Sequence, residues 1–268
     1  MAVNPNPAHE KITSFEVGYG YRSSKFTVNV NAYYTNWIDK TTTRSVNLSG
    51  EAAGQTGSFN MTGVNACHMG VEIAAIYKPA TWVEIEGMLS LGDYTWSSNA
   101  KGYFYDNYGY PLAALNGTLA SGVMAEDHLS ATLNQDGIKV GGSAQTTGAV
   151  SLRFKPDKNW RISAEWTFSA NNYSDYAISD SNFNPGSDIT VADPWEIPWG
   201  NQLDLSASYG FKIGGVNARL SGNVYNLFNY NYVVDAYTNA TEPGAWNNAY
   251  RVFYSFGRTY AMKLRINF

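Results

Sequence analysis

The chain of 268 residues has few charged side chains, a single cysteine and no long apolar run. Charged residues make up 15% of the sequence, against about 25% in a typical soluble domain. No segment approaches the roughly 18 to 20 consecutive apolar residues that a membrane-spanning helix needs. The lone Cys67 excludes a disulfide framework, and a net charge of -4 without a basic cluster argues against nucleic acid as a partner.

Aromatic residues are abundant, with 20 Tyr, 12 Phe and 8 Trp. The mean hydropathy is nevertheless -0.31, so the chain is not apolar overall. So many aromatic and so few charged residues argue against disorder. The combination favours a β protein whose two faces meet different solvents. Residues 1–11 lack the charged and apolar regions of a signal peptide, so we expect any targeting segment to lie outside this sequence.

Apolar and polar residues alternate along much of the chain. In residues 26–35, for example, Phe26, Val28 and Val30 alternate with Thr27 and Asn29. Successive side chains of a strand point to opposite faces, so each such segment predicts a strand with one apolar and one polar face. Nine segments of this kind begin near Ile12, Lys25, Cys67, Thr81, Ser143, Asn159, Asn201, Asn217 and Arg258.

The connections between these segments alternate between short and long. The short ones are rich in Lys, Gly, Pro and Ser, as tight turns are; the long ones are residues 45–66, 97–142, 174–200 and 230–250. Short periplasmic turns and long extracellular loops are typical of outer-membrane barrels. About ten residues per strand, tilted by ~40°, also match the ~25 Å apolar band of such barrels. We therefore predict an antiparallel transmembrane β-barrel, with a soluble β core as the alternative.

Nine strands are an odd number for a bacterial barrel. Single-chain barrels usually have an even number of strands and both termini in the periplasm. An open strand edge in hydrocarbon costs several kcal/mol for each unsatisfied backbone group. We therefore expect further strands upstream of this sequence. The alternative is a strand hidden in residues 97–142, which would give a small barrel that closes on itself.

Three segments resemble the TonB-dependent outer-membrane receptors. Residues 223–233 (NVYNLFNYNYV) followed by 256–268 (FGRTYAMKLRINF) resemble the C-terminal pattern of that family, in which an Asn-Leu-Phe segment and a loop precede a final alternating strand closing on Phe. Residues 4–22 (NPNPAHEKITSFEVGYGYR) resemble an upstream barrel strand of the same receptors. The richness in Tyr, Asn and Gly resembles members from the Bacteroidota.

The resemblance implies a barrel of 22 strands with an N-terminal plug domain. Residues 1–268 would form the last nine strands, without the plug. Members import scarce ligands such as siderophores, cobalamin or glycans across the outer membrane, with energy delivered by TonB, ExbB and ExbD. The implied partners are therefore outer-membrane lipid, the barrel-assembly machinery, the TonB complex acting through the missing N-terminal part, and in some members a surface lipoprotein. A small passive porin and a surface-binding β protein without transport are the alternatives.

Two sets of residues are candidate sites. The resemblance implies that the alternating C-terminal strand is a signal for the assembly machinery, with Tyr260, Leu264, Ile266 and Phe268 as its apolar positions. Aromatic side chains in the long loops are candidate ligand contacts, because aromatic faces stack on sugars or flat chelates. These are Tyr103, Tyr105, Tyr108, Trp195 and Trp199.

The sequence predicts no catalytic, cofactor or metal site. Cys67 and His68 are adjacent, but no third ligand stands at a suitable spacing. No Ser-His-Asp order, phosphate loop or HExxH motif is present. Charged residues on the predicted polar faces are expected to solvate the lumen or hold the plug; they are Glu84, Glu86, Arg153, Arg161, Glu165, Arg219, Lys263 and Arg265.

Overall fold

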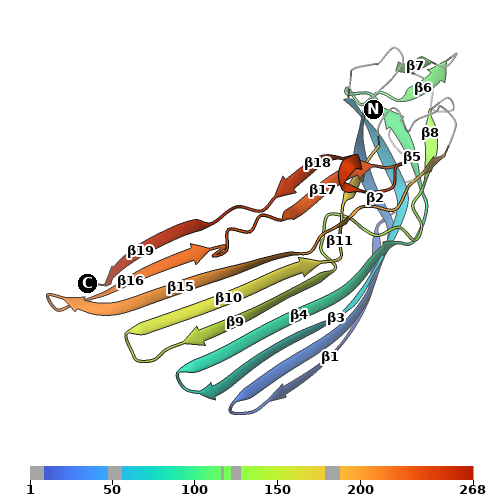
Figure 1. Cartoon of the computed structure of the whole chain (residues 1–268). Helices are drawn as coiled ribbons and strands as arrows, with labels where there is room; N and C mark the ends of the chain where they lie inside the picture. Colours follow the sequence, from blue (N-terminus) through green and yellow to red (C-terminus); the bar gives the residue numbers. More distant parts are fainter. Residues whose placement is uncertain (1–8, 48–55, 116–117, 122–127, 179–187, 268) are drawn as a thin grey trace.

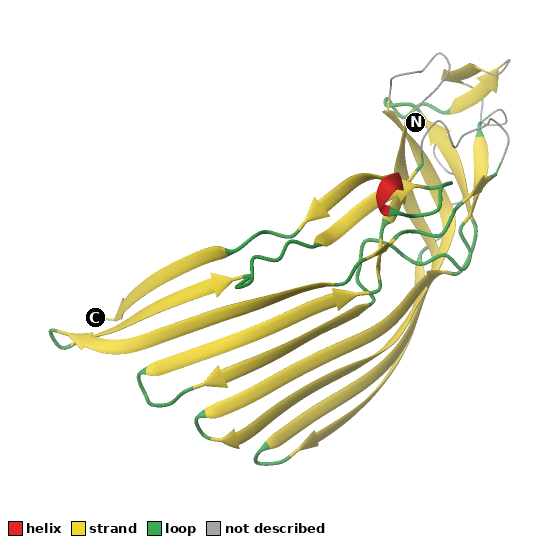
Figure 2. Cartoon of the chain, in the orientation of Figure 1, coloured by secondary structure: helices red, strands yellow, loops and turns green. Residues whose placement is uncertain are grey.

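A computed structural model describes residues 9–47, 56–115, 118–121, 128–178 and 188–267. Strands dominate this part of the chain, and its one short helix is a 3-10 turn, Trp246–Asn248 (Figure 2). In the described residues, no helix has the length and apolarity to cross a membrane.

Nine long strands form a curved antiparallel meander, here called the wall (Figure 1). Neighbours in sequence are neighbours in the sheet, as the alternation of short and long connections predicts. The wall confirms the all-β fold and all nine expected strands. In order they are β1 (Lys11–Arg22), β2 (Phe26–Asn47), β3 (Thr56–Ala80), β4 (Val83–Trp96), β9 (Thr146–Phe154), β10 (Trp160–Ala170), β15 (Gly200–Ile213), β16 (Val216–Tyr225) and β19 (Thr259–Asn267).

The wall has a turn end and a loop end. All the short connections lie at the turn end (Figure 1). A two-residue turn joins β15 to β16 through Gly214 and Gly215, which both have positive φ, a conformation that glycine adopts without steric cost. β1 enters at the loop end and β19 leaves at the turn end. Among the described strands, β1 pairs only with β2, and β19 only with β16, so the nine strands do not close.

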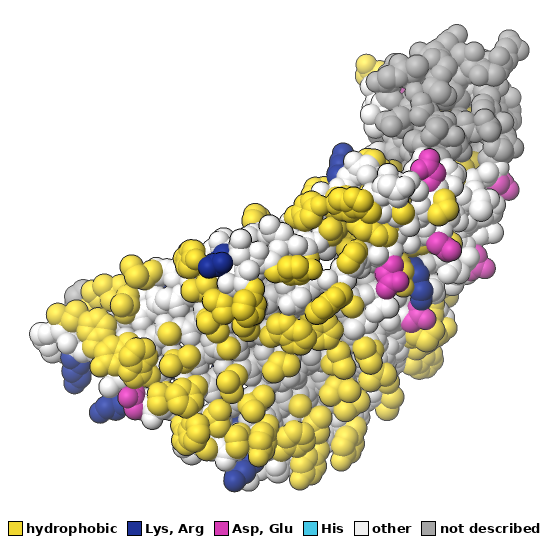
Figure 3. All heavy atoms as spheres, viewed as in Figure 1, with side chains coloured by type: hydrophobic (Ala, Val, Ile, Leu, Met, Phe, Trp, Pro, Cys, Tyr) yellow, Lys and Arg dark blue, Asp and Glu magenta, His cyan; other side chains and the backbone are white. Residues whose placement is uncertain are grey.

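One face of the wall is apolar and exposed. Val17, for instance, is 71% exposed and Val150 is 47% exposed. The strand register places the following exposed side chains on the same face: Phe15, Tyr19, Phe26, Met69, Val71, Ile73, Ile85, Leu91, Leu152, Ile162, Tyr209, Leu220, Tyr260, Met262, Leu264 and Ile266. Figure 3 shows hydrophobic side chains spread over the wall. A band of this kind is suited to lipid and not to water.

The opposite face is polar, and the register places all the charged residues predicted for it there. Near the turn end, Arg153 bridges two carboxylates, with Nη1 2.6 Å from Glu84 Oε1 and Nη2 2.8 Å from Glu86 Oε2. Lys78 Nζ is 2.8 Å from the other oxygen of Glu84. Nearer the loop end the hydroxyls of Tyr33 and Tyr94 hydrogen-bond at 2.8 Å. The ion pairs link neighbouring strands through their polar side chains, and the tyrosine pair links β2 to β4 across β3.

The first long connection is shorter than the sequence suggests. β2 continues to Asn47 and β3 begins at Thr56, so the prediction of a loop over residues 45–66 is wrong in extent. The pairing of β2 with β3 shifts register between Trp37 and Thr42, where Asp39 has a φ of 57°. This irregularity breaks the alternation that marks the rest of the strand. Past the irregularity, β2 and β3 continue to pair as a hairpin that projects beyond the wall.

The loop-end half of β3 carries a second group of strands. β5 (Ala100–Tyr105) pairs with it, β8 (Ser130–Asn134) pairs with β5, and β13 (Ile189–Thr190) pairs with β8. Strands thus do lie within residues 97–142, but they are short and do not extend the wall. The same region holds the smaller pairs β6 (Leu112–Leu115) with β7 (Thr118–Ser121) and β11 (Asn172–Tyr173) with β14 (Glu196–Ile197), and a sheet of β12 (Asp175–Ala177), β17 (Val233–Asn239) and β18 (Ala249–Tyr254).

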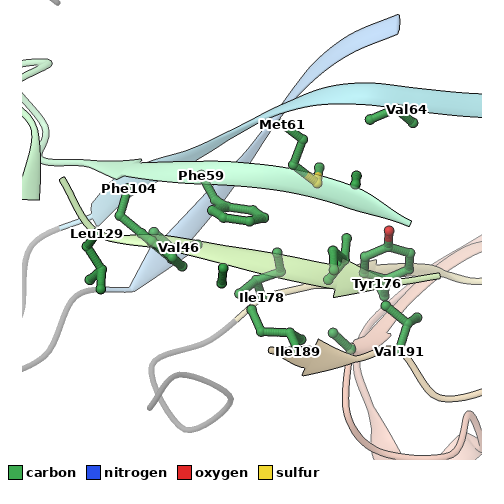
Figure 4. Close-up of a cluster of buried hydrophobic side chains, with 14 of the residues drawn as sticks. Val46, Phe59, Met61, Val64, Phe104, Leu129, Tyr176, Ile178, Ile189 and Val191 are labelled. Atoms are coloured by element: carbon green, nitrogen blue, oxygen red, sulfur yellow. The ribbon is translucent and has the colours of Figure 1, made fainter. Parts of the chain in front are cut away.

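These strands, together with the projecting hairpin of β2 and β3, are called the loop layer below. Its interior is a cluster of buried apolar side chains (Figure 4). Phe59 and Phe104 pack with ring centroids 4.5 Å apart, and Met61, Leu133 and Ile189 are also buried there. Val46 of β2 forms a parallel bridge with Ile178, which joins the projecting hairpin to the segment after β12. The loop layer therefore folds around a core of its own.

Candidate functional site

A cleft of about 720 Å³ lies within the loop layer, between the projecting part of β2 and the sheet of β12, β17 and β18. The cleft is lined by residues from β2, β12, β17 and β18 and from the segment between β17 and β18. Its volume lies within the range of about 300–1,000 Å³ that is usual for small-molecule sites. The lining residues are Thr43, Arg44, Ser45, Tyr176, Ala177, Ile178, Tyr237, Asn239, Glu242, Asn248, Tyr250 and Arg251.

Arg44 is the most tightly held side chain of the cleft. Its Nη1 lies 3.0 Å from Asp175 Oδ1 and donates a hydrogen bond of 2.9 Å to the backbone carbonyl of Tyr176. The guanidinium also lies 3.9 Å from the centroid of the Tyr176 ring, a cation–π distance. The Arg44 side chain is 15% exposed. It therefore links β2 to β12 through an ion pair, a hydrogen bond and a ring contact.

Two charged groups in this part of the loop layer, Arg44 and Asp235, have shifted pKa values. Burial opposes the charged form of Arg44, but its interactions with Tyr176 and Asp175 outweigh burial and hold its pKa above the ordinary value. Burial, together with the charge of Asp175, raises the pKa of the nearby Asp235 carboxyl. Arg44 thus remains charged, while Asp235 gains a proton more readily than a free carboxyl does.

Aromatic rings line the β17–β18 side of the cleft. The Tyr237 ring lies 6.3 Å from the rings of both Tyr250 and Phe253, measured between centroids. Arg251 extends its guanidinium to 5.8 Å from the Tyr250 ring. Tyr250 is 57% exposed, so much of its ring is free to contact a ligand.

Two buried polar atoms of the cleft residues have no hydrogen-bond partner within the described part of the chain. They are Nε of Arg44, which is a donor, and Oδ1 of Asn239, which is an acceptor. Buried polar atoms in proteins are nearly always paired. Both atoms are buried from solvent, so they belong to the packing beneath the cleft and not to its accessible surface.

The aromatic residues predicted from the sequence as ligand contacts lie elsewhere in the loop layer. Tyr103 and Tyr105 both pack on His128, with ring centroids 4.9 and 4.8 Å away. Trp195 packs on Trp246 at 5.7 Å, and Tyr108 and Trp199 are exposed. The structure brings Tyr103 and Tyr105 together, and none of the five lines the cleft. Their role as ligand contacts remains a prediction.

The cleft residues themselves escape sequence reasoning. Arg44 and Asp175 are 131 residues apart in the chain, and no motif links them. Tyr237, Tyr250 and Arg251 stand in a connection that shows no clear alternation. The one available signal is Arg44, a basic residue that directly follows the threonine run 41–43 in the β2 segment.

The wall and the loop layer can now be compared with known proteins. The family model described as "TonB dependent receptor-like, beta-barrel" matches residues 2–227. This chain belongs to that family. No curated protein matches the sequence.

Solved structures of TonB-dependent receptors share its fold. The copper transporter OprC superposes with a TM-score of 0.57 at 14% identity, covering 97% of this chain and 31% of that one. The ferric-catecholate import receptor Fiu from E. coli K12 gives 0.53 at 12% identity, covering 95% and 27%. The FrpB iron transporter from Neisseria meningitidis gives 0.52 at 16% identity, covering 98% and 32%. This chain thus spans about a third of the length of each of these receptors.

The predicted assembly signal of this receptor chain lies on β19. Tyr260, Met262, Leu264 and Ile266 are exposed on the apolar face of the wall, and Phe268 lies outside the described residues. The alternation of the strand is therefore as expected, and its recognition by the assembly machinery remains a prediction.

Cys67 and His68 point to opposite faces of β3, as neighbours on a strand do. His68 stacks on Tyr94, with centroids 4.6 Å apart, on the polar face. In the described part of the chain, no three His, Cys, Asp or Glu side chains gather closely enough to hold a metal ion. The family and the solved relatives are receptors and transporters, not enzymes.

Proposed function

We propose that this chain is the C-terminal part of an outer-membrane active transporter, the last nine strands of a 22-stranded barrel. The observation that carries the proposal is the wall itself. It is exposed and apolar on one face and polar and ion-paired on the other, which is the pattern of a barrel strand between lipid and lumen. The family to which the chain belongs is an outer-membrane family.

The unpaired edges support a partial barrel over a small porin. A self-contained barrel of nine or ten strands would need β1 and β19 to meet, directly or through one more strand. Among the described strands they do not pair, and exposed strand edges are not tolerated in hydrocarbon. The exposed apolar face likewise argues against a soluble sandwich, in which such side chains would be buried between sheets.

In this proposal the loop end faces the exterior and the cleft captures the ligand. Import would use energy delivered by TonB with ExbB and ExbD through the N-terminal part of the receptor. The assembly machinery would recognise the alternating C-terminal strand. The five loop aromatics predicted from the sequence would provide further contacts around the cleft or for a surface lipoprotein.

The test is ligand-dependent uptake by the full-length receptor in its native bacterium. We expect the receptor to fractionate with the outer membrane and uptake to stop when either the receptor gene or tonB is deleted. Uptake that persists without TonB would favour the passive porin. A receptor that is extracted without detergent would favour the soluble surface-binding protein.

The assembly signal is tested separately by deleting Phe268 from the full-length receptor. We expect less receptor in the outer membrane at equal synthesis, measured by blotting of membrane fractions. Unchanged insertion would remove the signal role from this strand.

A further inference from the structure

We propose that the cleft between β2, β12, β17 and β18 binds a neutral, polyhydroxylated ligand, namely a short oligosaccharide. The inference deepens the proposed function, since it names the ligand class that the cleft would capture for import. Four properties of the cleft carry it: its charge balance, its aromatic faces, its hydrogen-bonding groups and the charge of the surrounding loops.

The charges of the cleft compensate each other. The Arg44 guanidinium is neutralised by Asp175 at 3.0 Å. Of the remaining lining residues, only Arg251 and Glu242 are charged, and they have opposite signs. A multiply charged ligand would find no excess counter-charge to offset its loss of hydration. The cleft is therefore matched to a ligand without net charge.

The segments around the cleft would repel anions. In residues 98–139, 171–200 and 226–252, carboxylates outnumber basic side chains. Leaving out Asp175, which pairs with Arg44, the described carboxylates there are Asp106, Asp136, Asp188, Asp193, Glu196, Asp235 and Glu242, against Lys101, Lys139 and Arg251. Charge of one sign around a cleft selects ligands by Coulombic steering. An anionic chelate would approach this end of the molecule against its field.

Metal ions are also a poor match for the lining. It contains neither His nor Cys, and Glu242 is its only carboxylate. Transition metals are held by several imidazole, thiolate or carboxylate ligands. The cleft has no such set.

The aromatic rings provide what a sugar ring needs. Tyr250 is 57% exposed and lies beside Tyr237, with centroids 6.3 Å apart. The apolar C–H faces of a pyranose stack on such rings, while its hydroxyls remain at the edge. The third ring, Tyr176, is covered on one face by the Arg44 guanidinium. Tyr250 is therefore the ring best placed for stacking.

The polar groups of the cleft offer donors and acceptors in mixture. Thr43 and Ser45 contribute hydroxyls, and Asn239 and Asn248 contribute amides. A sugar hydroxyl both donates and accepts, so it can pair with hydroxyls and amides alike. A purely anionic group accepts only and would use only the donors of this set.

Binding to the purified full-length receptor tests the ligand class. The probes are a panel of neutral oligosaccharides, matched oligosaccharides containing uronic acids, a ferric catecholate and Cu²⁺, each measured by calorimetry in detergent. We expect one or more neutral oligosaccharides to bind and the charged probes not to. Tyr250→Ala should weaken that binding by about tenfold or more. Tyr110→Ala, an exposed tyrosine outside the cleft, should leave it unchanged.

Three results would overturn the proposal. The first is binding of the ferric catecholate, Cu²⁺ or the acidic oligosaccharides, with none of the neutral oligosaccharides bound. The second is binding of a neutral oligosaccharide that Tyr250→Ala and the milder Asn239→Leu both leave unchanged, which would place the sugar elsewhere. Absence of binding by every neutral probe at millimolar concentration also counts against it. None of these results touches the proposed function, which fails if uptake by the receptor is independent of TonB or if the receptor is extracted without detergent.

Discussion

The wall and the loop layer use the same residue types in opposite ways. In the wall, Val17 and Phe15 are 71% and 69% exposed. In the loop layer, Phe59 and Leu133 are fully buried. The wall places apolar side chains outward because lipid is its solvent, and the loop layer gathers them inward because water is its solvent. Along β2 and β3 the apolar side chains therefore change from exposed to buried. The change occurs where the strands leave the band of exposed apolar side chains.

The largest effect is expected from truncating one buried side chain in the core of the loop layer. Phe59→Ala in the full-length receptor should cost the loop layer about 3–5 kcal/mol, because it removes a fully buried ring and leaves a cavity. Amide hydrogen exchange should rise in β5, β8 and the projecting β2–β3 hairpin, while exchange in β10 and β15 stays slow. Tyr110→Ala is the control. Equal loss of protection in both regions would mean that they do not fold as separate units.

The corresponding test of the wall places a charged side chain on its apolar face. Val150→Arg should destabilise the inserted receptor by about 2–4 kcal/mol, the cost of a basic residue near the bilayer midplane. Its sequence neighbour Ala149 lies on the polar face, so Ala149→Arg is the matched control and should be better tolerated. The readout is the temperature at which the folded band is lost in heat-modifiability gels. The reverse order of the two variants would assign the faces the other way round.

A smaller effect is expected where the projecting part of β2 contacts β12 within the loop layer. Arg44→Met removes one partner of a largely buried ion pair, and because Asp175 keeps some contact with solvent, the loss should be about 1–3 kcal/mol. The double variant with Asp175→Asn should lose less than the sum of the single variants. Chemical denaturation of the loop layer, followed by tryptophan fluorescence, measures the cycle. Strict additivity would show that the pair contributes nothing to holding β12 on β2.

The smallest effect concerns the titration of Asp235. Because its pKa is raised in the folded loop layer, its contribution to stability is full at acid pH and is lost as the pH rises through the folded pKa. Asp235→Asn keeps the acceptor for the Ala236 N–H and removes the charge. The variant should therefore be slightly more stable than the wild type at pH 7, and the difference should vanish toward pH 3. A variant less stable at pH 7 would contradict the raised pKa.

How much the sequence predicts also differs between the two regions. In the wall, period-two alternation identifies all nine strands and both faces, because each strand is in contact with two solvents along its length. In the loop layer the alternation is confined to short stretches, such as Ser58–Thr62 of β3 and Ser130–Asn134 of β8, which are too brief to distinguish a strand from a connection. The bulge at Asp39 interrupts the alternation where the hairpin projects. Long-range contacts such as that of Arg44 with Asp175 depend on how the loops fold together, which local pattern does not encode.

The way the cleft is assembled determines which antibodies can recognise it. Its lining comes from β2, β12, β17 and β18, segments that span more than two hundred residues of chain from Thr43 to Arg251. Its surface would therefore be a discontinuous epitope if the loop end faces outward. Antibodies raised against a peptide from any one loop should therefore fail to bind the cleft of the folded receptor. An antibody or phage that recognises the cleft should no longer bind when the loop layer is unfolded, even though the wall stays in the membrane.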